Sequence, residues 1–507
     1  MIVDKPAHQN FLSSLSVAFR PFGKLGKESK AKFCNVANKW KTNHKYDLGS
    51  ARLESEMTIA DLVIKNGTIV TESYTFDGAI AVDGGKISSI TSNENAPSAN
   101  RVIDAKGLHV LPGVIDVHVH FRDPGYTYKE DFGSGTAAAA AGGVTLIFDM
   151  PNNFPPPKNV DALNQKIEAA KKAIVDYGLY GLLTVGNIAD LMPLAEAGVI
   201  GYKCFMSETV GKIPPPNDGE MIDQFAVVSK ANLRVSVHAE NDPILQYRIK
   251  KLTSEGRGDA HAHYESRTHV VEEEAVLRAI LYAAESKCKL HIAHLSGDRA
   301  LVAVAEAKRR YQPVTAETCP HYLLLDDEQY VKIGSLMKMN PSIKTANDKA
   351  ALWAALNNGT IDMIATDHSP HTYDEKNKPM IFDCISGFPG LETAVPLMLT
   401  GVNKGMLPLT TYVKLTSGNP ARAWRLYPQK GAIRVGSDAD FTLVDLKAKS
   451  KVDPSKFYTK AKWSPFDGFE VQGLPVYTVV CGNVVMDHGV VDTKPVGKMV
   501  SPLPGTV

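Results

Sequence analysis

The stretch GVIDVHVHFRDPG, residues 113–125, places two histidines, His118 and His120, one residue apart at the end of an apolar run. The run is typical of a buried strand, and side chains at positions i and i+2 of a strand point to the same face. Both imidazoles are therefore expected to face one spot. Two core histidines that hydrogen-bond to their neighbours would produce the same pattern, so the rest of the chain must decide between packing and a functional site.

The sequence from residue 113 onward alternates strands with helices. Between the strands lie segments such as DALNQKIEAAKKAIVDYG, in which apolar residues recur at helical spacing. The expected strands are GVIDVHVH, VTLIFDM, YGLLTV, VIGYKCF, LRVSVHA, KLHIAHL, PVTAET and IDMIAT. This alternation argues for parallel pairing, and eight such units close into a (β/α)₈ TIM barrel. We therefore predict an α/β protein with its barrel domain at residues 113–427.

The segments on either side of the barrel have a different pattern of apolar and turn residues. Residues 57–112 alternate short β-branched runs with turn residues, which indicates antiparallel sheet, and the β texture returns after residue 428. We predict that 57–112 and 428–507 together form a flanking β-sandwich domain. Residues 1–56 carry more Lys and Arg than Asp and Glu and show no clear pattern. We expect them to be a poorly ordered N-terminal extension.

Composition excludes several classes of protein. The 507 residues are 44% hydrophobic and 22% charged, as in an ordinary globular protein with more than one structural unit. A formal net charge of +1 argues against nucleic acid or an anionic membrane as partner. No apolar run approaches the roughly 20 residues that span a bilayer. The six cysteines form no C-x-x-C pair, which favours reduced thiols and a cytoplasmic location.

Active sites of TIM barrels lie at the carboxyl ends of the strands. Six polar residues are expected there, on strands one, four, five, six and eight: His118, His120, Lys203, His238, His294 and Asp367. Each one alone could be a satisfied polar contact or a helix cap. Together, four imidazoles and a carboxylate suit Zn²⁺, and they exceed what one tetrahedral site needs. We therefore predict a site for two metal ions.

Lys203 does not fit such a site as an ammonium, because a positive charge would then point at two cations. The conflict disappears if its nitrogen carries CO₂ as a carbamate, an anion that can bridge both metals. The sequence itself does not establish this modification.

With these motifs the chain resembles the cyclic amidohydrolases, which are dihydroorotases, allantoinases and hydantoinases. The resemblance rests on H-V-H, the barrel lysine, the two later histidines and T-D-H-S-P-H, and it runs from about Ala60 to the end of the chain. It implies one zinc on His118 and His120, a second zinc on His238 and His294, and carbamylated Lys203 between them. It also implies that Asp367 is a ligand and the general acid/base that opens or closes a cyclic amide, and that the protein forms a homodimer or homotetramer.

The substrate is predicted from residues that could hold its own charge. Arg122 alone would suggest a rim salt bridge to Asp123 or Glu130. In dihydroorotases, however, this Arg, the Asn of M-P-N and the last His of D-H-x-P-H hold the substrate's carboxylate, and a mobile-loop Thr is found in some of them. The matching positions here are Arg122, Asn152, Asn340 in KMNPSIK, His371 and Thr209.

We therefore predict a dihydroorotase that interconverts N-carbamoyl-L-aspartate and L-dihydroorotate. The segment ISGFPGLET, residues 385–393, also looks like the dihydroorotase loop that meets the pyrimidine ring, whereas ETCPHYL, residues 317–323, is more typical of allantoinases and hydantoinases. An allantoinase or a hydantoinase (dihydropyrimidinase) is the first alternative. A catalytically inactive assembly protein of this fold and a zinc-storing barrel are further alternatives, which a complete ligand set and an acid/base disfavour.

Overall fold

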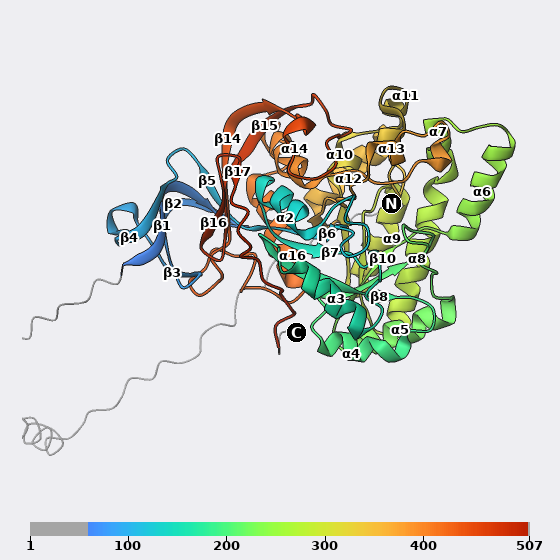
Figure 1. Cartoon of the computed structure of the whole chain (residues 1–507), viewed down its shortest axis with the longest axis horizontal. Helices are drawn as coiled ribbons and strands as arrows, with labels where there is room; N and C mark the ends of the chain where they lie inside the picture. The colour runs from blue at the N-terminus through green and yellow to red at the C-terminus, as the bar shows by residue number, and fades with distance from the viewer. Residues whose placement is uncertain (1–58, 505–507) are drawn as a thin grey trace, which may run out of the picture. The chain divides into compact units, whose positions relative to one another are not determined.

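The computed structural model describes residues 59–504, which form a barrel and an adjoining sheet (Figure 1). The predicted N-terminal extension lies outside the described residues. Within residues 59–504, no helix combines the length and the apolar character that crossing a bilayer requires.

The barrel is built from parallel strands that follow one another in chain order. Eight strands of residues 59–504 form it: β6 (Val114–Val119), β7 (Val144–Asp149), β8 (Asp176–Leu183), β9 (Gly201–Phe205), β10 (Arg234–His238), β11 (Lys289–Ile292), β12 (Val314–Thr318) and β13 (Met363–Ile364). The ring approaches closure where the backbone N of His120 donates to the carbonyl oxygen of His368 at 2.8 Å. All the predicted barrel strands are confirmed, and with them the fold class.

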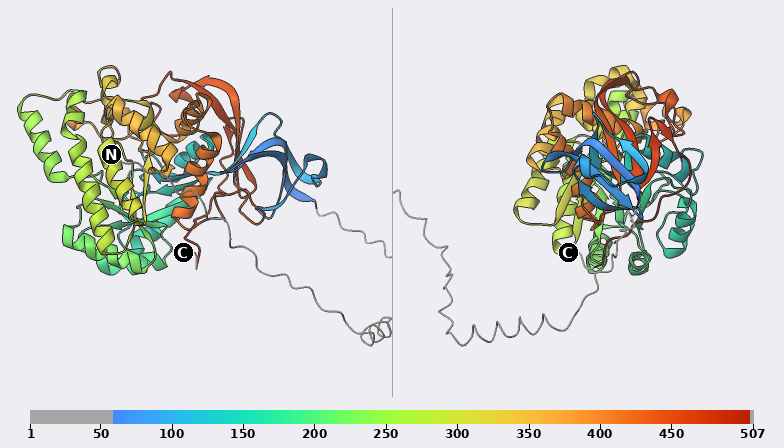
Figure 2. Two further views of the ribbon diagram at one scale, coloured as in Figure 1. Left: turned by 180° about the vertical axis from the view of Figure 1, so that it is seen from behind. Right: turned by 90° about the vertical axis from the view of Figure 1, so that its left-hand side faces the viewer.

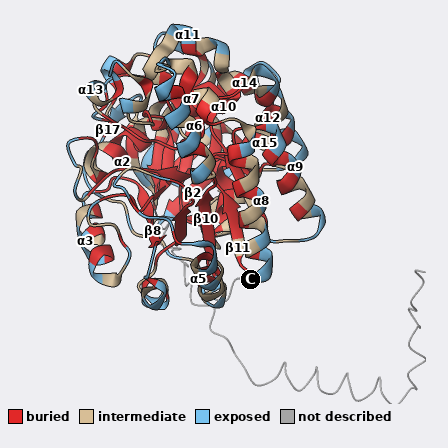
Figure 3. Ribbon diagram, turned by 90° about the vertical axis from the view of Figure 1, so that its right-hand side faces the viewer, coloured by how far each residue is buried: buried red, intermediate tan, exposed pale blue. Residues whose placement is uncertain are grey.

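Helices surround these strands, with their exposed faces outward and their buried faces toward the strands (Figure 3). The described α-helices are α2 (Phe132–Ala141), α3 (Val160–Ala170), α4 (Leu191–Glu196), α5 (Asp218–Lys230), α6 (Asp242–Ser254), α7 (Ala260–Ser266), α8 (His269–Glu285), α9 (Asp298–Arg309), α10 (Pro320–Leu324), α11 (Tyr330–Ile333), α12 (Ala346–Asn358), α13 (Tyr373–Lys376), α14 (Leu391–Asn403), α15 (Leu409–Val413) and α16 (Asn419–Ala423). Because helices cover the outer face and side chains fill the interior, strands such as β8 are buried along their whole length and read as continuous apolar runs.

The two flanking segments meet in one sheet, as predicted (Figure 2). Its strands are β1 (Ala60–Val70), β2 (Thr75–Asp83), β3 (Lys86–Thr91), β4 (Ala99–Asp104), β5 (His109–Pro112), β14 (Phe441–Lys451), β15 (Glu470–Val480), β16 (Asn483–Asp487) and β17 (Val490–Val491). The antiparallel pair of β5 and β14 joins the first segment to the last. The sheet packs a core of its own, in which Leu62 and Ile80 lie with Phe441.

The expectation of purely antiparallel pairing in residues 57–112 was wrong. β1 pairs with β2 in antiparallel fashion but with β4 and β5 in parallel fashion. The alternation of apolar and polar residues indicates which side chains are buried in a strand, but it carries no information on strand direction. Direction is set by the connection after β3, which brings the chain back along β1.

The sheet leads directly into the barrel at Gly113, between β5 and β6. A side chain at this position would clash, because a Cβ on Gly113 would lie 2.1 Å from Oγ1 of Thr145. The sheet therefore adjoins the amino-terminal end of β6, whereas His118 and His120 lie at the opposite end. The predicted domain limits at residues 112 and 428 stay predictions.

Candidate active site

A pocket of about 500 Å³ opens at the carboxyl ends of the barrel strands. Nearly all the predicted site residues line it: His118, His120, Arg122, Asn152, Lys203, Thr209, His238, His294, Asn340 and Asp367. Of the predicted residues, His371 does not line the pocket. The fold thus brings side chains from seven strands and the loops that follow them to the mouth of the barrel.

The histidines and Asp367 converge in two groups. The Oδ1 atom of Asp367 lies 3.3 Å from Nε2 of His118 and 3.0 Å from Nε2 of His120. On the other side, Nδ1 of His238 lies 2.9 Å from Nε2 of His294. Ligand atoms of His118, His294 and Asp367 lie within 4.8 Å of one another, a spacing at which they could hold a metal ion.

The backbone turns sharply where two of these side chains enter the pocket. His294 has a φ of 37° and Asp367 has a φ of 47°, both in the left-handed region. Side chains other than glycine hold this conformation only where the surroundings enforce it, which is common at functional sites.

A buried carboxylate, Glu317 near the end of β12, lies behind His118. It accepts hydrogen bonds from Nδ1 of His118, from Nε2 of His291 at 3.0 Å and from the backbone N of His294 at 3.1 Å. Burial favours the neutral acid, but the imidazoles of His118 and His291 hold the pKa of Glu317 well below its ordinary value. With its Nδ1 proton donated to Glu317, His118 presents the lone pair of Nε2 to the pocket.

A second buried carboxylate supports His238. Glu240 lies 2.8 Å from Nε2 of His238 and forms an ion pair with Arg267. Nδ1 of His238 is thereby directed toward His294. Sequence analysis missed Glu240 and Arg267, as well as Glu317, although Glu240 follows His238 at the same i+2 spacing that links His118 and His120.

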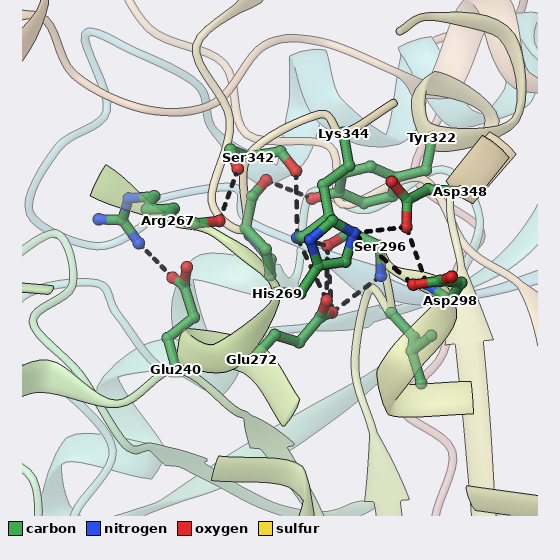
Figure 4. A network of polar contacts seen from close by, with 12 residues as sticks. Glu240, Arg267, His269, Glu272, Ser296, Asp298, Tyr322, Ser342, Lys344 and Asp348 are labelled. Carbon is green, nitrogen blue, oxygen red and sulfur yellow. Dashed lines mark hydrogen bonds and ion pairs between the residues drawn. The ribbon is translucent and has the colours of Figure 1, made fainter. Parts of the chain in front are cut away.

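Figure 4 shows that the contacts of Arg267 continue into the loop of residues 338–344. The hydroxyl of Ser342 donates to the carbonyl oxygen of Arg267 at 3.0 Å. In the same network, Nζ of Lys344 lies 3.2 Å from Glu272, which also accepts hydrogen bonds from Ser296. These buried contacts hold the loop that carries Asn340 against the pocket.

Lys203, on β9, is fully buried. Its Nζ has no hydrogen-bond partner among residues 59–504, and burial lowers its pKa to about 8. The aromatic ring of Phe205 lies 5.3 Å away. A buried amine that lines the pocket without an anionic partner is the environment in which a lysine readily loses its proton.

Arg122 is buried as well, and its guanidinium faces the pocket. Within the described part of the chain, neither Nε nor Nη1 has a hydrogen-bond partner. The salt bridge considered from the sequence is not formed, because Asp123 pairs with Lys172 at 2.8 Å and Glu130 accepts the hydroxyls of Ser134 and Thr459. Burial lowers the pKa of Arg122 to about 10, so it remains a cation at neutral pH.

The other predicted substrate residues differ in their contacts. Asn152 accepts from Nδ1 of His120 at 2.6 Å and donates to Oγ1 of Thr209 at 3.4 Å. Asn340 accepts from the hydroxyl of Ser386 at 2.9 Å. His371 is buried behind the wall of the pocket, where its Nδ1 contacts Lys129. Asn152 thus combines a place in the pocket with control of a neighbouring histidine.

The fold and this site define the class, a TIM-barrel protein with a buried cluster of histidines and a carboxylate at its mouth that could hold a metal ion. Residues 109–485 match the model of the Amidohydrolase family. The chain belongs to this family, in agreement with the resemblance seen in its motifs.

Relatives with three different names are similarly close to this chain. L-hydantoinase from Paenarthrobacter aurescens is 37% identical over 85% of this chain and 95% of the relative. Dihydroorotase from Methanosarcina mazei is 37% identical over 86% and 96%, and allantoinase from Solibacter usitatus is 34% identical over 88% and 98%. Identity alone therefore does not select a substrate.

The solved structure of L-hydantoinase from Arthrobacter aurescens superimposes with a TM-score of 0.85 at 35% identity. The match covers 87% of this chain and 100% of that structure. The likeness extends over the barrel and the flanking sheet together.

Proposed function

We propose that this chain is a zinc-dependent hydrolase of cyclic amides and that its substrate pair is N-carbamoyl-L-aspartate and L-dihydroorotate. The observation that carries the choice of substrate is the guanidinium of Arg122, which is buried at the pocket and has no anionic partner among residues 59–504. A buried cation of this kind is costly unless a ligand completes it. A carboxylate matches a guanidinium through two parallel hydrogen bonds.

The donor set fits two Zn²⁺ ions. Imidazole nitrogens and carboxylate oxygens are ligands that zinc prefers. Behind three of the four histidines lies a hydrogen-bonding partner, Glu317, Asn152 or Glu240, that directs the other ring nitrogen inward. The buried amine of Lys203 fits if it carries CO₂ as a carbamate, because the charge that faces the metals is then negative. Bound Zn²⁺ would polarise the ring carbonyl and lower the pKa of the attacking water.

Asp367 is placed to move the proton. When the ring opens, water adds to the amide carbon, the carbon–nitrogen bond breaks and one proton must pass from the water to the leaving nitrogen. Asp367 accepts that proton and returns it to the nitrogen, and in ring closure it acts in the opposite order. Its position against His118 and His120 keeps the carboxylate in reach of the reacting carbon.

The remaining side chains select the substrate. Arg122 binds the carboxylate of dihydroorotate, with Asn152, Asn340 and His371 around it, and Thr209 closes over the site from the loop after β9. Hydantoin and allantoin lack this carboxylate and would leave Arg122 unpaired. A site that leaves a buried polar group unpaired discriminates strongly against that ligand.

A substrate panel tests the proposal. Zinc-loaded protein should turn over L-dihydroorotate with a kcat/KM well above those for allantoin, hydantoin and dihydrouracil. Arg122→Met should remove that preference, whereas Arg310→Met, at an exposed position on the outer surface, should not. Preference for allantoin or a hydantoin, the relatives' other named substrates, would contradict the choice of dihydroorotate and leave the hydrolase intact.

Two further parts of the proposal have their own measurements. Zinc reconstitution in CO₂-free buffer should give poor metal uptake that bicarbonate restores, and ¹³C-labelled bicarbonate should yield a carbamate resonance that Lys203→Met abolishes. Light scattering should find a homodimer or homotetramer. Failure to bind zinc at all would favour an inactive assembly protein of the same fold.

A further inference from the structure

His371, one of the residues proposed to surround the substrate's carboxylate, has a lysine next to one of its ring nitrogens. Nζ of Lys129 lies 3.1 Å from Nδ1 of His371, and both side chains are buried. Lys129 also pairs with Glu375, whose Oε1 lies 2.8 Å from Nζ. Nothing in the sequence pattern pointed to Lys129.

This contact determines which ring nitrogen of His371 carries the proton. An ammonium group has three donors and no acceptor, so Nδ1 must accept and the proton of a neutral ring must lie on Nε2. Burial lowers the pKa of Lys129, and the carboxylate of Glu375 acts against this, because an opposite charge at this distance favours the ammonium form. The alternative donation, from Nδ1 to Oε2 of Glu375, would span 3.7 Å, which is too long for a hydrogen bond.

The ring itself stays neutral. Burial, together with the charges of Arg122 and Lys129, holds the pKa of His371 well below its ordinary value, although Glu375 acts in the opposite direction. His371 therefore has one donor, at Nε2.

That donor faces the wall of the pocket. Nε2 of His371 has no hydrogen-bond partner in the described part of the chain. A Cβ on Gly387 would lie 3.2 Å from Nε2 and 2.6 Å from Cβ of Ser369, and Ser369 lines the pocket. Gly387 has a φ of 121°, which glycine permits, and its lack of a side chain avoids a clash with Ser369 next to Nε2. A buried donor at this place suits an oxygen acceptor of a ligand.

We propose that Lys129 is a specificity-determining positioning residue, which holds His371 as an Nε2–H donor toward the carboxylate that Arg122 binds. The inference rests on the proposed function. Without Lys129, the nearby carboxylate of Glu375 would draw the ring proton to Nδ1. The lone pair of Nε2 would then face the substrate's carboxylate and repel it.

The first test compares ligands with and without a carboxylate on zinc-loaded protein. In Lys129→Met, the KM for L-dihydroorotate and the Kd for orotate should rise about 10-fold to 100-fold, which corresponds to one hydrogen bond to a charged group. The Kd for uracil and the kcat at saturating dihydroorotate should change far less. Lys129→Arg, which keeps a donor-only group, should recover most of the loss. Lys171→Met, at an exposed lysine, is the matched control.

The second test reads the tautomer directly. In ¹⁵N-histidine correlation spectra, with the resonance assigned by its absence in His371→Gln, His371 should be Nε2–H in the wild type and shift toward Nδ1–H in Lys129→Met. An Nδ1–H ring in the wild type would overturn the inference. Equal losses for orotate and uracil in Lys129→Met would also overturn it, since that pattern indicates a general structural role.

These outcomes are distinguishable from failure of the proposed function. If the wild-type protein binds uracil as well as orotate, the assignment of dihydroorotate fails, whatever Lys129 does. The tautomer measurement then still decides whether Lys129 sets the ring proton.

Discussion

Replacement of Glu317 tests whether the carboxylate behind His118 controls metal binding. Glu317 is buried and accepts three hydrogen bonds, from His118, His291 and the backbone of His294. In Glu317→Gln, the amide oxygen can keep the His118 and His294 side while the NH₂ group turns to His291. That ring can then change its tautomer, because its Nδ1 can donate to Oγ1 of Thr315 at 2.9 Å.

The two substitutions of Glu317 should therefore differ in size. Glu317→Gln exchanges a charged acceptor for a neutral one at His118, and charge-assisted hydrogen bonds are roughly twice as strong as neutral ones. A loss of about 1.4 kcal/mol corresponds to a tenfold weaker zinc affinity. Glu317→Leu removes the acceptor altogether, so zinc affinity should fall about 100-fold, at the upper end for partners of metal ligands.

Competition titration against a zinc chelator measures both variants, with circular dichroism to confirm that they fold. Glu392→Gln is the matched control. It also replaces a carboxylate, here a half-buried one that accepts from the backbone of Tyr458 and Thr459 and, within residues 59–504, has no hydrogen bond to a histidine of the site. Folded Glu317→Gln and Glu317→Leu proteins with wild-type zinc affinity would refute the reasoning.

Three further predictions concern other side chains. Arg267→Met leaves the carboxylate of Glu240 buried with its ion pair broken, so the free energy of unfolding in urea should fall by about 3–5 kcal/mol. The double variant Glu240→Leu/Arg267→Met should recover stability but not zinc affinity. A single variant as stable as the wild type would contradict this reasoning. Asp367→Asn should keep most of its zinc, measured by elemental analysis, while turnover falls about 10²-fold to 10⁴-fold. Asparagine accepts the left-handed φ of 47° as aspartate does, so the backbone should not change. Normal turnover in this variant would therefore show that Asp367 does not transfer the proton. Burial raises the pKa of Glu392 to about 7, whereas an unfolded glutamate ionises near pH 4.3. Ionisation is thus easier in the unfolded chain, and wild-type stability should fall by roughly 3 kcal/mol relative to Glu392→Gln as the pH rises from 5 to above 7; parallel stability profiles for the two proteins would show that Glu392 does not titrate in this range.

The strands of the barrel were predictable because burial on both faces leaves continuous apolar runs between helical segments. The clustering of the candidate metal-binding side chains was predictable for a related reason. In a parallel barrel every strand ends at the same rim, so a polar residue at a strand end, such as His238 or Asp367, must lie at that rim. Strand direction in the flanking sheet was not predictable, because alternation in β1, β4 and β5 is the same for parallel and antiparallel neighbours.

The sequence by itself determined the fold class, the mouth of the barrel and the residue types that gather there, since all three follow from local periodicity. Only the tertiary structure decided what lies behind those residues. Glu317 reaches His118 across 199 positions of the chain, and Lys129 reaches His371 across 242. The structure also showed that Arg122 has no protein anion as its partner within residues 59–504, although Asp123 and Glu130 lie close in sequence. Hydrogen bonds form between atoms that the fold brings within about 3 Å, and sequence spacing carries no such distances.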